Sequence, residues 1–318
     1  ARDDEEPEGG VDVHVGVTGA SGLIGSALVN RLTKEQHRVS RLVRRPAGPG
    51  EISWDPEAGR LDSNDLEGLD AVVHLAGENI GVRWTKARKA KIRNSRIQGT
   101  RLLSEALART RRHPQVLVSG SALGIYGDRG DEILTENSAL GPADDFLAVV
   151  GQEWENAADA ARTAGMRVVH PRFGLVLSAD GGALGRMLLP FRLGLGGRLG
   201  DGSQWMSWIS IGDAAGALVH MLLNSGLSGP VNVTAPAPVR NRDFTRTLGW
   251  VLSRPTPFPV PAVALRLTLG EMAASTLLAS ARMLPERLLA SGYRFAHPDL
   301  ETALRHVLGA DRRAILPQ

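Results

Sequence analysis

His14-Val15-Gly16-Val17-Thr18-Gly19-Ala20-Ser21-Gly22-Leu23-Ile24-Gly25 is the stretch that decides the fold. The β-branched run at 11–17 predicts a buried strand, and apolar periodicity predicts a helix over 22–36. The three glycines keep the spacing of a dinucleotide-binding turn: Gly19 allows the tight turn, Gly22 the close approach of a pyrophosphate, and Gly25 close packing of helix on strand. The phosphates would face the N–H groups at the helix start. A plain strand–helix turn is the alternative, but the flanking strand, the flanking helix and the N-terminal position favour a cofactor site.

Composition narrows the function classes. The chain has 318 residues with Lys+Arg 37 against Asp+Glu 34, and a formal net charge of +3 gives no reason to expect nucleic-acid binding. Cysteine is absent, which excludes disulfides and cysteine-ligated metals, and the histidines lack metal-ligand spacing, so we expect no metal. No apolar run approaches the ~18 residues of a membrane span, and no signal peptide is visible. A cytoplasmic protein is therefore expected.

The second expected strand, at 38–43, bears on the choice of cofactor. Enzymes that prefer NAD usually place an acidic residue near the end of this strand to hold the ribose 2′-hydroxyl. Here Arg41, Arg44 and Arg45 occupy the region, and no acidic residue follows before Glu51. Guanidinium groups suit a 2′-phosphate, so NADP(H) is the expected cofactor, with Arg44 as the first choice. The alternative is that these are ordinary surface arginines.

Strands and helices alternate along the first half of the chain. Further strands are expected at 70–78, 116–119 and 166–177, and helices at 84–113 and 144–164, with a loop at 131–142. This alternation predicts an α/β fold with a doubly wound parallel Rossmann-type sheet and a smaller, mainly helical C-terminal substrate domain. We expect a disordered acidic lead-in at 1–10, an NADP-binding Rossmann domain at 11–177 to which 209–234 returns, and a substrate domain at 178–208 and 235–318.

Ligands of doubly wound sheets bind outside the carboxyl ends of the strands. Leu75, Ala76 and Gly77 follow a buried strand and would pass close to the cofactor with small side chains and backbone. His74 lies within the apolar run of that strand, so we expect a core histidine rather than a catalytic one.

Several phrases along the chain are typical of one family. They are TGASGLIG at 18–25, HLAGENI at 74–80, RW at 83–84, NSRIQGT at 94–100, SGSALGIYG at 119–127, LLPFRLGLGGRLGDGSQWMSWISIGD at 188–213 and ERLLASGYRF at 286–295. In these phrases the chain resembles an atypical branch of the extended short-chain dehydrogenase/reductases, within the NAD-dependent epimerase/dehydratase superfamily. Members of this branch are called epimerase family proteins, and some are labelled cell-division-inhibitor-like. The branch carries its own C-terminal domain of unknown function, and the resemblance covers 11–308.

The resemblance implies a Rossmann-type fold with NADP(H) in the groove. Besides the packing glycine Gly25, the cofactor contacts carried over by motif would be Gly19, Ser21, Gly22, Leu23, Ile24, Arg44, Leu75, Ala76, Gly77, Glu78, Lys91 and Arg96. A substrate would lie between the sheet edge and the C-terminal domain, near Pro190, Phe191, Gln204, Trp205 and Trp208.

The acid–base pair of the superfamily is missing. Its chemistry usually needs a Ser or Thr, a Tyr, and a Lys four residues after the Tyr that lowers the pKa of the phenol. Tyr126 is followed four residues later by Gly130 and Tyr293 by His297, and alignment through Glu155 puts Leu147 and Gly151 at the Tyr and Lys positions. Ser121 falls at the position of the catalytic Ser or Thr, and Tyr126 is the nearest phenol, so these two are the candidate catalytic residues. Ser121 as a capping hydroxyl is an equal alternative, and the carboxylates Glu78, Glu155 and Asp213 are weaker candidates.

Two functions remain open. The first is an NADP(H)-dependent oxidoreductase or epimerase-like enzyme that acts on an unknown small molecule. The second is a regulatory or interaction protein that binds NADPH and has lost catalysis. A third and weaker interpretation takes the basic helix around 83–101 as a contact for an anionic surface. The sequence leaves the oligomeric state open, with a homodimer as one option.

Overall fold

The computed structural model describes residues 12–310, and the expected lead-in at 1–10 lies outside these residues. Its centre is a parallel sheet in the order β12-β8-β5-β4-β1-β2-β3, with β6 paired to β8. The strands are β1 (His14–Thr18), β2 (Arg38–Val43), β3 (Glu51–Ser53), β4 (Ala71–His74), β5 (Val116–Ser119), β6 (Ser121–Ala122), β8 (Arg167–Phe173) and β12 (Gly229–Val233). The strand order reverses direction at β1 and β4, so the expected doubly wound Rossmann-type sheet is confirmed.

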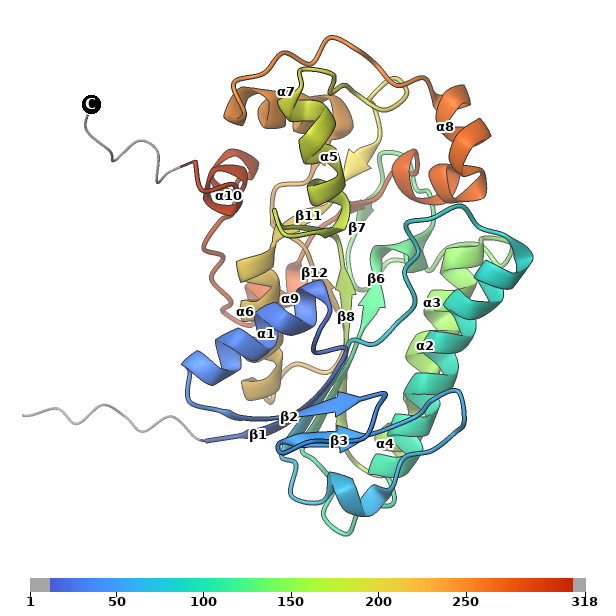
Figure 1. Cartoon of the computed structure of the whole chain (residues 1–318), viewed down its shortest axis with the longest axis vertical. Coiled ribbons are helices and arrows are strands. Elements are labelled where there is room, and N and C mark those ends of the chain that lie inside the picture. Colours follow the sequence, from blue (N-terminus) through green and yellow to red (C-terminus); the bar gives the residue numbers. More distant parts are fainter. Residues whose placement is uncertain (1–11, 311–318) are drawn as a thin grey trace, which may run out of the picture.

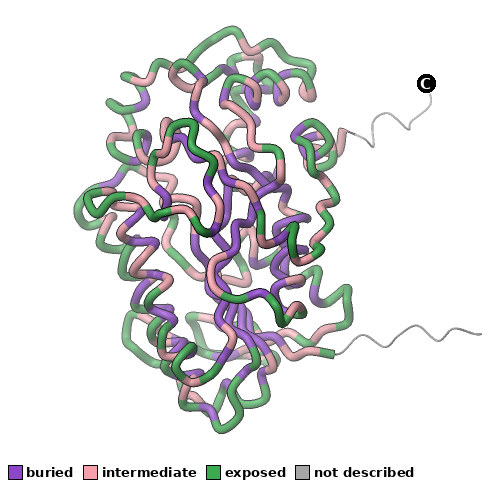
Figure 2. The backbone as a smooth tube through the Cα atoms, turned by 180° about the vertical axis from the view of Figure 1, so that it is seen from behind, coloured by how far each residue is buried: buried purple, intermediate pink, exposed green. Residues whose placement is uncertain are grey.

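Helices cover both faces of this sheet (Figure 1). One face carries α1 (Leu23–Lys34) and α6 (Ile211–Leu223), and the other carries α2 (Lys86–Leu107), α3 (Phe146–Asn156) and α4 (Asp159–Thr163). Successive strand residues point to opposite faces. Val15 and Val17 therefore lie in the core with α1 and α6, while Val72 lies in the core with α2 and α4. Figure 2 shows the buried residues concentrated along the sheet.

Two expected elements are interrupted in the structure. The strand expected at 166–177 is interrupted at Gly174, where the backbone of Ser207 comes so close that an added Cβ would lie 2.6 Å from its carbonyl oxygen. The chain leaves the main sheet at this point, and β9 (Leu175–Leu177) pairs instead with β11 (Trp208–Ser210). The helix expected at 144–164 is divided into α3 and α4.

The C-terminal region is mainly helical, as expected. It contains α5 (Gly182–Arg192), α7 (Asn241–Val251), α8 (Ala262–Leu269), a π-helical turn (Ala273–Leu277), α9 (Glu286–Ala290) and α10 (Leu300–Val307). Two small sheets connect it to the rest, β10 (Trp205–Met206) with β13 (Val239–Arg240) and β14 (Arg282–Met283) with β7 (Ile133–Leu134). Helix α5 was not predicted, and β7 lies where we expected only a loop.

The last segment of the region is held by one buried carboxylate. Asp213, at the start of α6, accepts the backbone N–H groups of Ala296 at 2.7 Å and His297 at 3.0 Å. The Tyr293 hydroxyl donates to the Asp213 carbonyl oxygen at 2.8 Å. This binding explains the ERLLASGYRF phrase as a docking segment, and it gives Asp213 a structural role. Among residues 12–310, no helix combines the length and the apolar character needed to cross a membrane.

Candidate functional site

The glycine turn after β1 is closed to side chains and open to a ligand. A Cβ on Gly25 would lie 2.1 Å from the carbonyl oxygen of Gly19, so α1 can approach the turn only with glycine there. Gly19 itself has φ +65°, and a Cβ added to it would lie 2.8–2.9 Å from backbone atoms of Leu75 and Ala76. Gly22 precedes α1 without a side-chain cap, and the first turn contains no acidic residue. The uncapped N–H groups at this helix start, together with its dipole, form a fitting site for a pyrophosphate.

Thr18 and His74 fix the second wall of this turn. The Thr18 hydroxyl accepts the backbone N–H groups of Leu75 at 3.0 Å and Ala76 at 3.2 Å. Its own proton is therefore directed to Nδ1 of His74, 2.7 Å away. Burial, together with the charge of Arg96, lowers the pKa of His74 to about 4, so the ring is neutral near pH 7. His74 is the core residue that we expected, and it holds the segment after β4 beside the glycine turn.

The arginines at the end of β2 are not equivalent. Arg45 binds both carboxylate oxygens of Glu51 at 2.6 and 2.7 Å. This contact lowers the pKa of Glu51 and neutralises the first acidic residue after the strand. Arg44 is exposed and makes no hydrogen bond or ion pair with any residue of 12–310. Of the two, Arg44 is the guanidinium free to bind a ligand.

Arg96 reaches from α2 to the segment after β4. Its Nη1 donates to the carbonyl oxygens of Glu78 at 3.1 Å and Ile92 at 3.2 Å, and its guanidinium lies 5.0 Å from the Trp154 ring centroid. A side chain on Gly77 would touch this guanidinium at 3.4 Å. Burial lowers the pKa of Arg96 to about 10, which leaves it protonated at neutral pH beside the segment that follows β4.

Lys91 lies on the same face of α2 as two residues that contact Glu78. Arg88 forms an ion pair with the Glu78 carboxylate at 3.1 Å, and the Ser95 hydroxyl accepts the Glu78 N–H at 3.0 Å. Residues three and four apart on a helix are neighbours, so the exposed Lys91 stands next to this contact.

Most of the other charges on the basic helix have partners within the molecule. Lys89 pairs with Glu271, Arg93 pairs with Glu153, and Arg83 binds backbone oxygens of α8. These contacts reduce the free positive charge of 83–101 and weaken its interpretation as an anionic-surface contact.

Ser121 belongs to a buried network that the sequence did not predict. Its hydroxyl donates to Oε1 of Glu155 at 2.7 Å, and Arg172 binds both oxygens of the same carboxylate at 2.8 Å. Arg172 also donates to the Tyr126 hydroxyl at 2.9 Å, which in turn donates to Oδ1 of Asn232 at 2.8 Å. The side chains of Arg172 and Glu155 are only 4% and 12% exposed. Burial acts to lower the pKa of Arg172, but its bonds to Glu155 outweigh this and raise it overall.

The location of Tyr126 argues against the expected catalytic role. The residue has no exposed surface, and its hydroxyl is fully used inside the network. Burial raises the pKa of the phenol, although the charge of Arg172 opposes this rise. A catalytic phenol would need a lowered pKa and access to substrate, so Tyr126 is better explained as a packing residue.

Tight packing occupies the two positions where the superfamily has its Tyr and Lys. Helix α3 lies against the short helical turn Leu123–Tyr126. A side chain on Gly124 would be 3.0 Å from Cβ of Leu147, and one on Gly151 would be 2.9 Å from Cβ of Ile125. There is no room for a lysine at 151 without moving α3.

The residues expected near a substrate are spread over the C-terminal region and differ in exposure. Trp208 and Phe191 are 0% and 5% exposed and lie in the apolar core of the C-terminal region. The Gln204 amide donates to two backbone oxygens. Trp205 lies beneath the guanidinium groups of Arg240 and Arg282, and Pro190 is exposed on α5. These contacts give the residues a part in the packing of the C-terminal region, and their role in binding a substrate remains a prediction.

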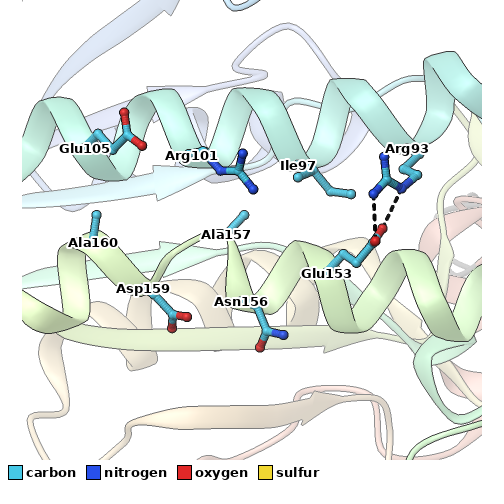
Figure 3. A pocket seen from close by; sticks show the side chains of 9 residues that line it. All are labelled: Arg93, Ile97, Arg101, Glu105, Glu153, Asn156, Ala157, Asp159 and Ala160. Atoms are coloured by element: carbon cyan, nitrogen blue, oxygen red, sulfur yellow. Dashed lines mark hydrogen bonds and ion pairs between the residues drawn. The ribbon is translucent and has the colours of Figure 1, made fainter.

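One open groove of the surface lies elsewhere, between α2 and α3–α4 (Figure 3). It contains the Arg93–Glu153 ion pair and is lined by Arg93, Ile97, Arg101, Glu105, Glu153, Asn156, Ala157, Asp159 and Ala160. None of these residues was predicted as a cofactor or substrate contact. Within residues 12–310, no cluster of three His, Asp or Glu side chains could hold a metal ion.

Comparison with known proteins agrees with this geometry. The model of the NAD dependent epimerase/dehydratase family matches residues 15–234, and a domain of unknown function (DUF1731) matches residues 260–307. The epimerase family protein Mb2239 of Mycobacterium bovis is 45% identical over 292 residues, which are 91% of this chain and 96% of that protein. The human epimerase family protein SDR39U1 is 38% identical and covers 92% of this chain and 98% of its own length.

Two solved structures support the same assignment. The crystal structure of human SDR39U1 (isoform 2) with NADPH has a TM-score of 0.85 at 36% identity and covers 93% of this chain and 99% of that chain. A nucleoside-diphosphate sugar epimerase from Corynebacterium glutamicum has a TM-score of 0.79 at 38% identity over 94% of this chain and 59% of that chain. The chain therefore belongs to the NAD dependent epimerase/dehydratase family, with its C-terminal DUF1731 domain.

Proposed function

We propose that this chain binds NADP(H) across the glycine turn and acts in the cytoplasm as an oxidoreductase or epimerase-like enzyme on a small molecule. The related human protein was crystallised with NADPH, which supports the choice of cofactor. The cofactor contacts in the proposal are Gly19, Ser21, Gly22, Leu23, Ile24, Gly25, Arg44, Leu75, Ala76, Gly77, Glu78, Lys91 and Arg96. A bound cofactor would supply the hydride.

The single observation that carries the proposal is which of the charged side chains after β2 have partners and which do not. Glu51 is the acidic residue that could hold a ribose 2′-hydroxyl, and both its oxygens are occupied by Arg45. Arg44 remains without a partner among residues 12–310, on the sheet edge next to the glycine turn. A free guanidinium beside a neutralised carboxylate favours a 2′-phosphate over a 2′-hydroxyl.

Ser121 is the group that we propose for the chemistry. It follows β5 at the carboxyl edge of the sheet, where ligands of such folds bind. Its proton is held by Glu155, and Arg172 binds both oxygens of that carboxylate. To polarise a carbonyl group of a substrate, Ser121 would have to redirect this proton. Glu155 and Arg172 act in the proposal as positioning residues.

Binding of NADPH and NADH to purified protein tests the proposal. Replacing Arg44 with Gln should weaken NADPH binding by roughly 10- to 100-fold, the size of a lost charge-assisted bond. NADH binding should not change. Arg38→Gln, at the opposite end of the same strand, is the matched control and should affect neither cofactor. Equal losses for both cofactors, or no loss of NADPH binding, would contradict the role of Arg44.

The second candidate function is an NADPH-binding regulatory protein with reduced catalysis. It is favoured by the packed Leu147 and Gly151, which leave no Tyr–Lys pair beside the sheet. Incubation with deuterated NADPH and a panel of carbonyl compounds and nucleotide sugars separates the two functions. Transfer of deuterium to a product, abolished in Ser121→Ala, would reject the regulatory protein. Unchanged NADPH across the panel would favour the regulatory protein.

A homodimer is our proposal for the assembly, which sedimentation equilibrium would check.

A further inference from the structure

Exposed apolar side chains gather at one end of the molecule. Leu193, Leu195, Phe258, Val263 and Leu267 are each more than half exposed, and we call them the tip surface. The elements that carry or adjoin these residues, α5, α7 and α8, lie at one end of the molecule, away from β2 and β3 (Figure 1). Leu189 and Trp250 lie nearby in the sequence and are also exposed. Large exposed apolar groups that cluster in this way usually mark a contact surface.

Two segments that lie side by side carry the tip surface. The backbone of Val260 exchanges hydrogen bonds with Arg198 and Gly200 at 2.8 and 2.9 Å. A side chain on Gly197 would collide with the carbonyl oxygen of Phe258, and a Cβ added to Gly194 would lie 3.8 Å from the Pro255 ring. Because these segments are in contact, apolar groups from residues near 193 and near 258 belong to one continuous region.

Unpaired arginines surround the tip surface. The exposed side chains of Arg192, Arg198 and Arg266 make no hydrogen bond or ion pair with the part of the chain at 12–310. Asp243 pairs with Arg246, and Asp201 accepts from Ser203 while the charge of Arg198 helps to lower the pKa of Asp201. The region therefore combines apolar groups with positive charge.

We propose that the tip surface docks peripherally on a bilayer that contains anionic phospholipids. Leucine and phenylalanine side chains would enter the headgroup region, and the arginines would bind lipid phosphates. A second copy of the chain fits less well. In a symmetric dimer the same patch faces itself, which would bring the guanidinium groups of both copies together. The proposal does not depend on the reaction that the protein carries out.

Sedimentation with vesicles tests the proposal on the whole chain. We expect binding to vesicles in which a third of the phosphatidylcholine is replaced by phosphatidylglycerol, little binding to phosphatidylcholine alone, and weaker binding as salt is raised. Phe258→Ser with Leu267→Ser should abolish sedimentation. Arg192→Gln, Arg198→Gln and Arg266→Gln should each weaken it by roughly fivefold.

Matched controls use exposed residues outside the tip surface. Leu223→Ser on α6, and Arg101→Gln with Arg109→Gln on or just after α2, should leave vesicle binding unchanged. Circular dichroism and thermal unfolding would verify that each variant is folded. Equal binding to neutral and anionic vesicles, or no binding to either, would overturn the proposal. So would a dimer that Phe258→Ser dissociates, or binding to polyglutamate without binding to vesicles.

Discussion

Two groups of polar residues lie along the carboxyl edge of the same sheet and differ in what they bind. Around the glycine turn, the helix start is uncapped and Arg44 has no partner among residues 12–310. In the buried network, Ser121, Glu155, Arg172 and Tyr126 bind one another. The first group has unused hydrogen-bonding capacity, and the second has almost none.

This difference in unused hydrogen-bonding capacity suits the glycine turn to ligand binding and makes the buried network a poor source of protons. Unused donors at a surface groove cost little because water can bind them, and a phosphate can replace that water. A buried ion pair is stable only while all its members remain, because a lone buried charge is strongly unfavourable. The proposed cofactor site therefore has donors ready for a ligand, whereas catalysis by Ser121 would require the network to release a proton.

The largest effect should come from breaking the network. Arg172→Met leaves the Glu155 carboxylate buried without its ion pair, and we expect a loss of about 3–5 kcal/mol in the free energy of unfolding. Urea unfolding followed by tryptophan fluorescence would measure it. Arg93→Met is the matched control. It breaks a similar two-bond ion pair with Glu153, which lies on α3 as Glu155 does. That pair is exposed, so its loss should cost less than about 1 kcal/mol. Similar losses in the free energy of unfolding for both variants would show that burial does not make the Arg172–Glu155 pair more important for stability than the exposed pair.

His74, which binds Thr18 beside the glycine turn, should make stability depend on pH. Its pKa is about 4 in the folded protein against 6.5 for the free side chain, because burial disfavours the charged form. Between pH 6.5 and about 4 the side chain of His74 is therefore protonated in the unfolded chain and neutral in the folded chain. The free energy of unfolding should fall as the pH decreases through this range. The contribution is at most about 3 kcal/mol. In His74→Asn, which can still accept the Thr18 proton, the decline over this window should be smaller. Parallel curves of Tm against pH for both proteins would refute the assignment.

Adding a single methyl group to the glycine turn should weaken binding of the proposed cofactor. Gly25→Ala would place Cβ 2.1 Å from the Gly19 carbonyl oxygen, so α1 must shift away from the turn. We expect NADPH affinity to fall by at least tenfold, measured by titration of NADPH fluorescence. Gly212→Ala on α6 is the control, because its nearest neighbour would be 4.0 Å away. An unchanged affinity in Gly25→Ala would mean that the turn does not position the pyrophosphate.

The sequence predicted the Rossmann half well because its signals are local. The bounds of β2 and β5 are as expected at 38–43 and 116–119, and the glycine turn follows directly from residue spacing. His74 was recognised as a core residue from the apolar run around it. In each case the residues that determine the structure are neighbours in the sequence.

Contacts between distant segments account for the errors. Glu155 and Arg172 are 17 residues apart and meet only because α3 packs beside β8. Trp208 and Phe191 in a glycine-rich segment fit a pocket or a core equally well, and Leu177 and Ala235 from other segments decide for the core. Helix α5 was missed because it contains Gly185 and Pro190, and burial of Leu184 and Leu188 compensates for their weak helix propensity.

Ser121→Ala should have the smallest effect on stability. This variant also tests most directly whether the buried network takes part in the chemistry. The substitution removes one hydrogen bond to Glu155 but leaves the pair with Arg172 intact, so the free energy of unfolding should fall by only about 1 kcal/mol. NADPH affinity should stay the same, because the hydroxyl is bound within the network. If hydride transfer is nevertheless lost, the Ser121 proton takes part in the reaction and the network must open to a substrate. If transfer persists, Ser121 is a capping hydroxyl, and the proton must come from another group near the cofactor.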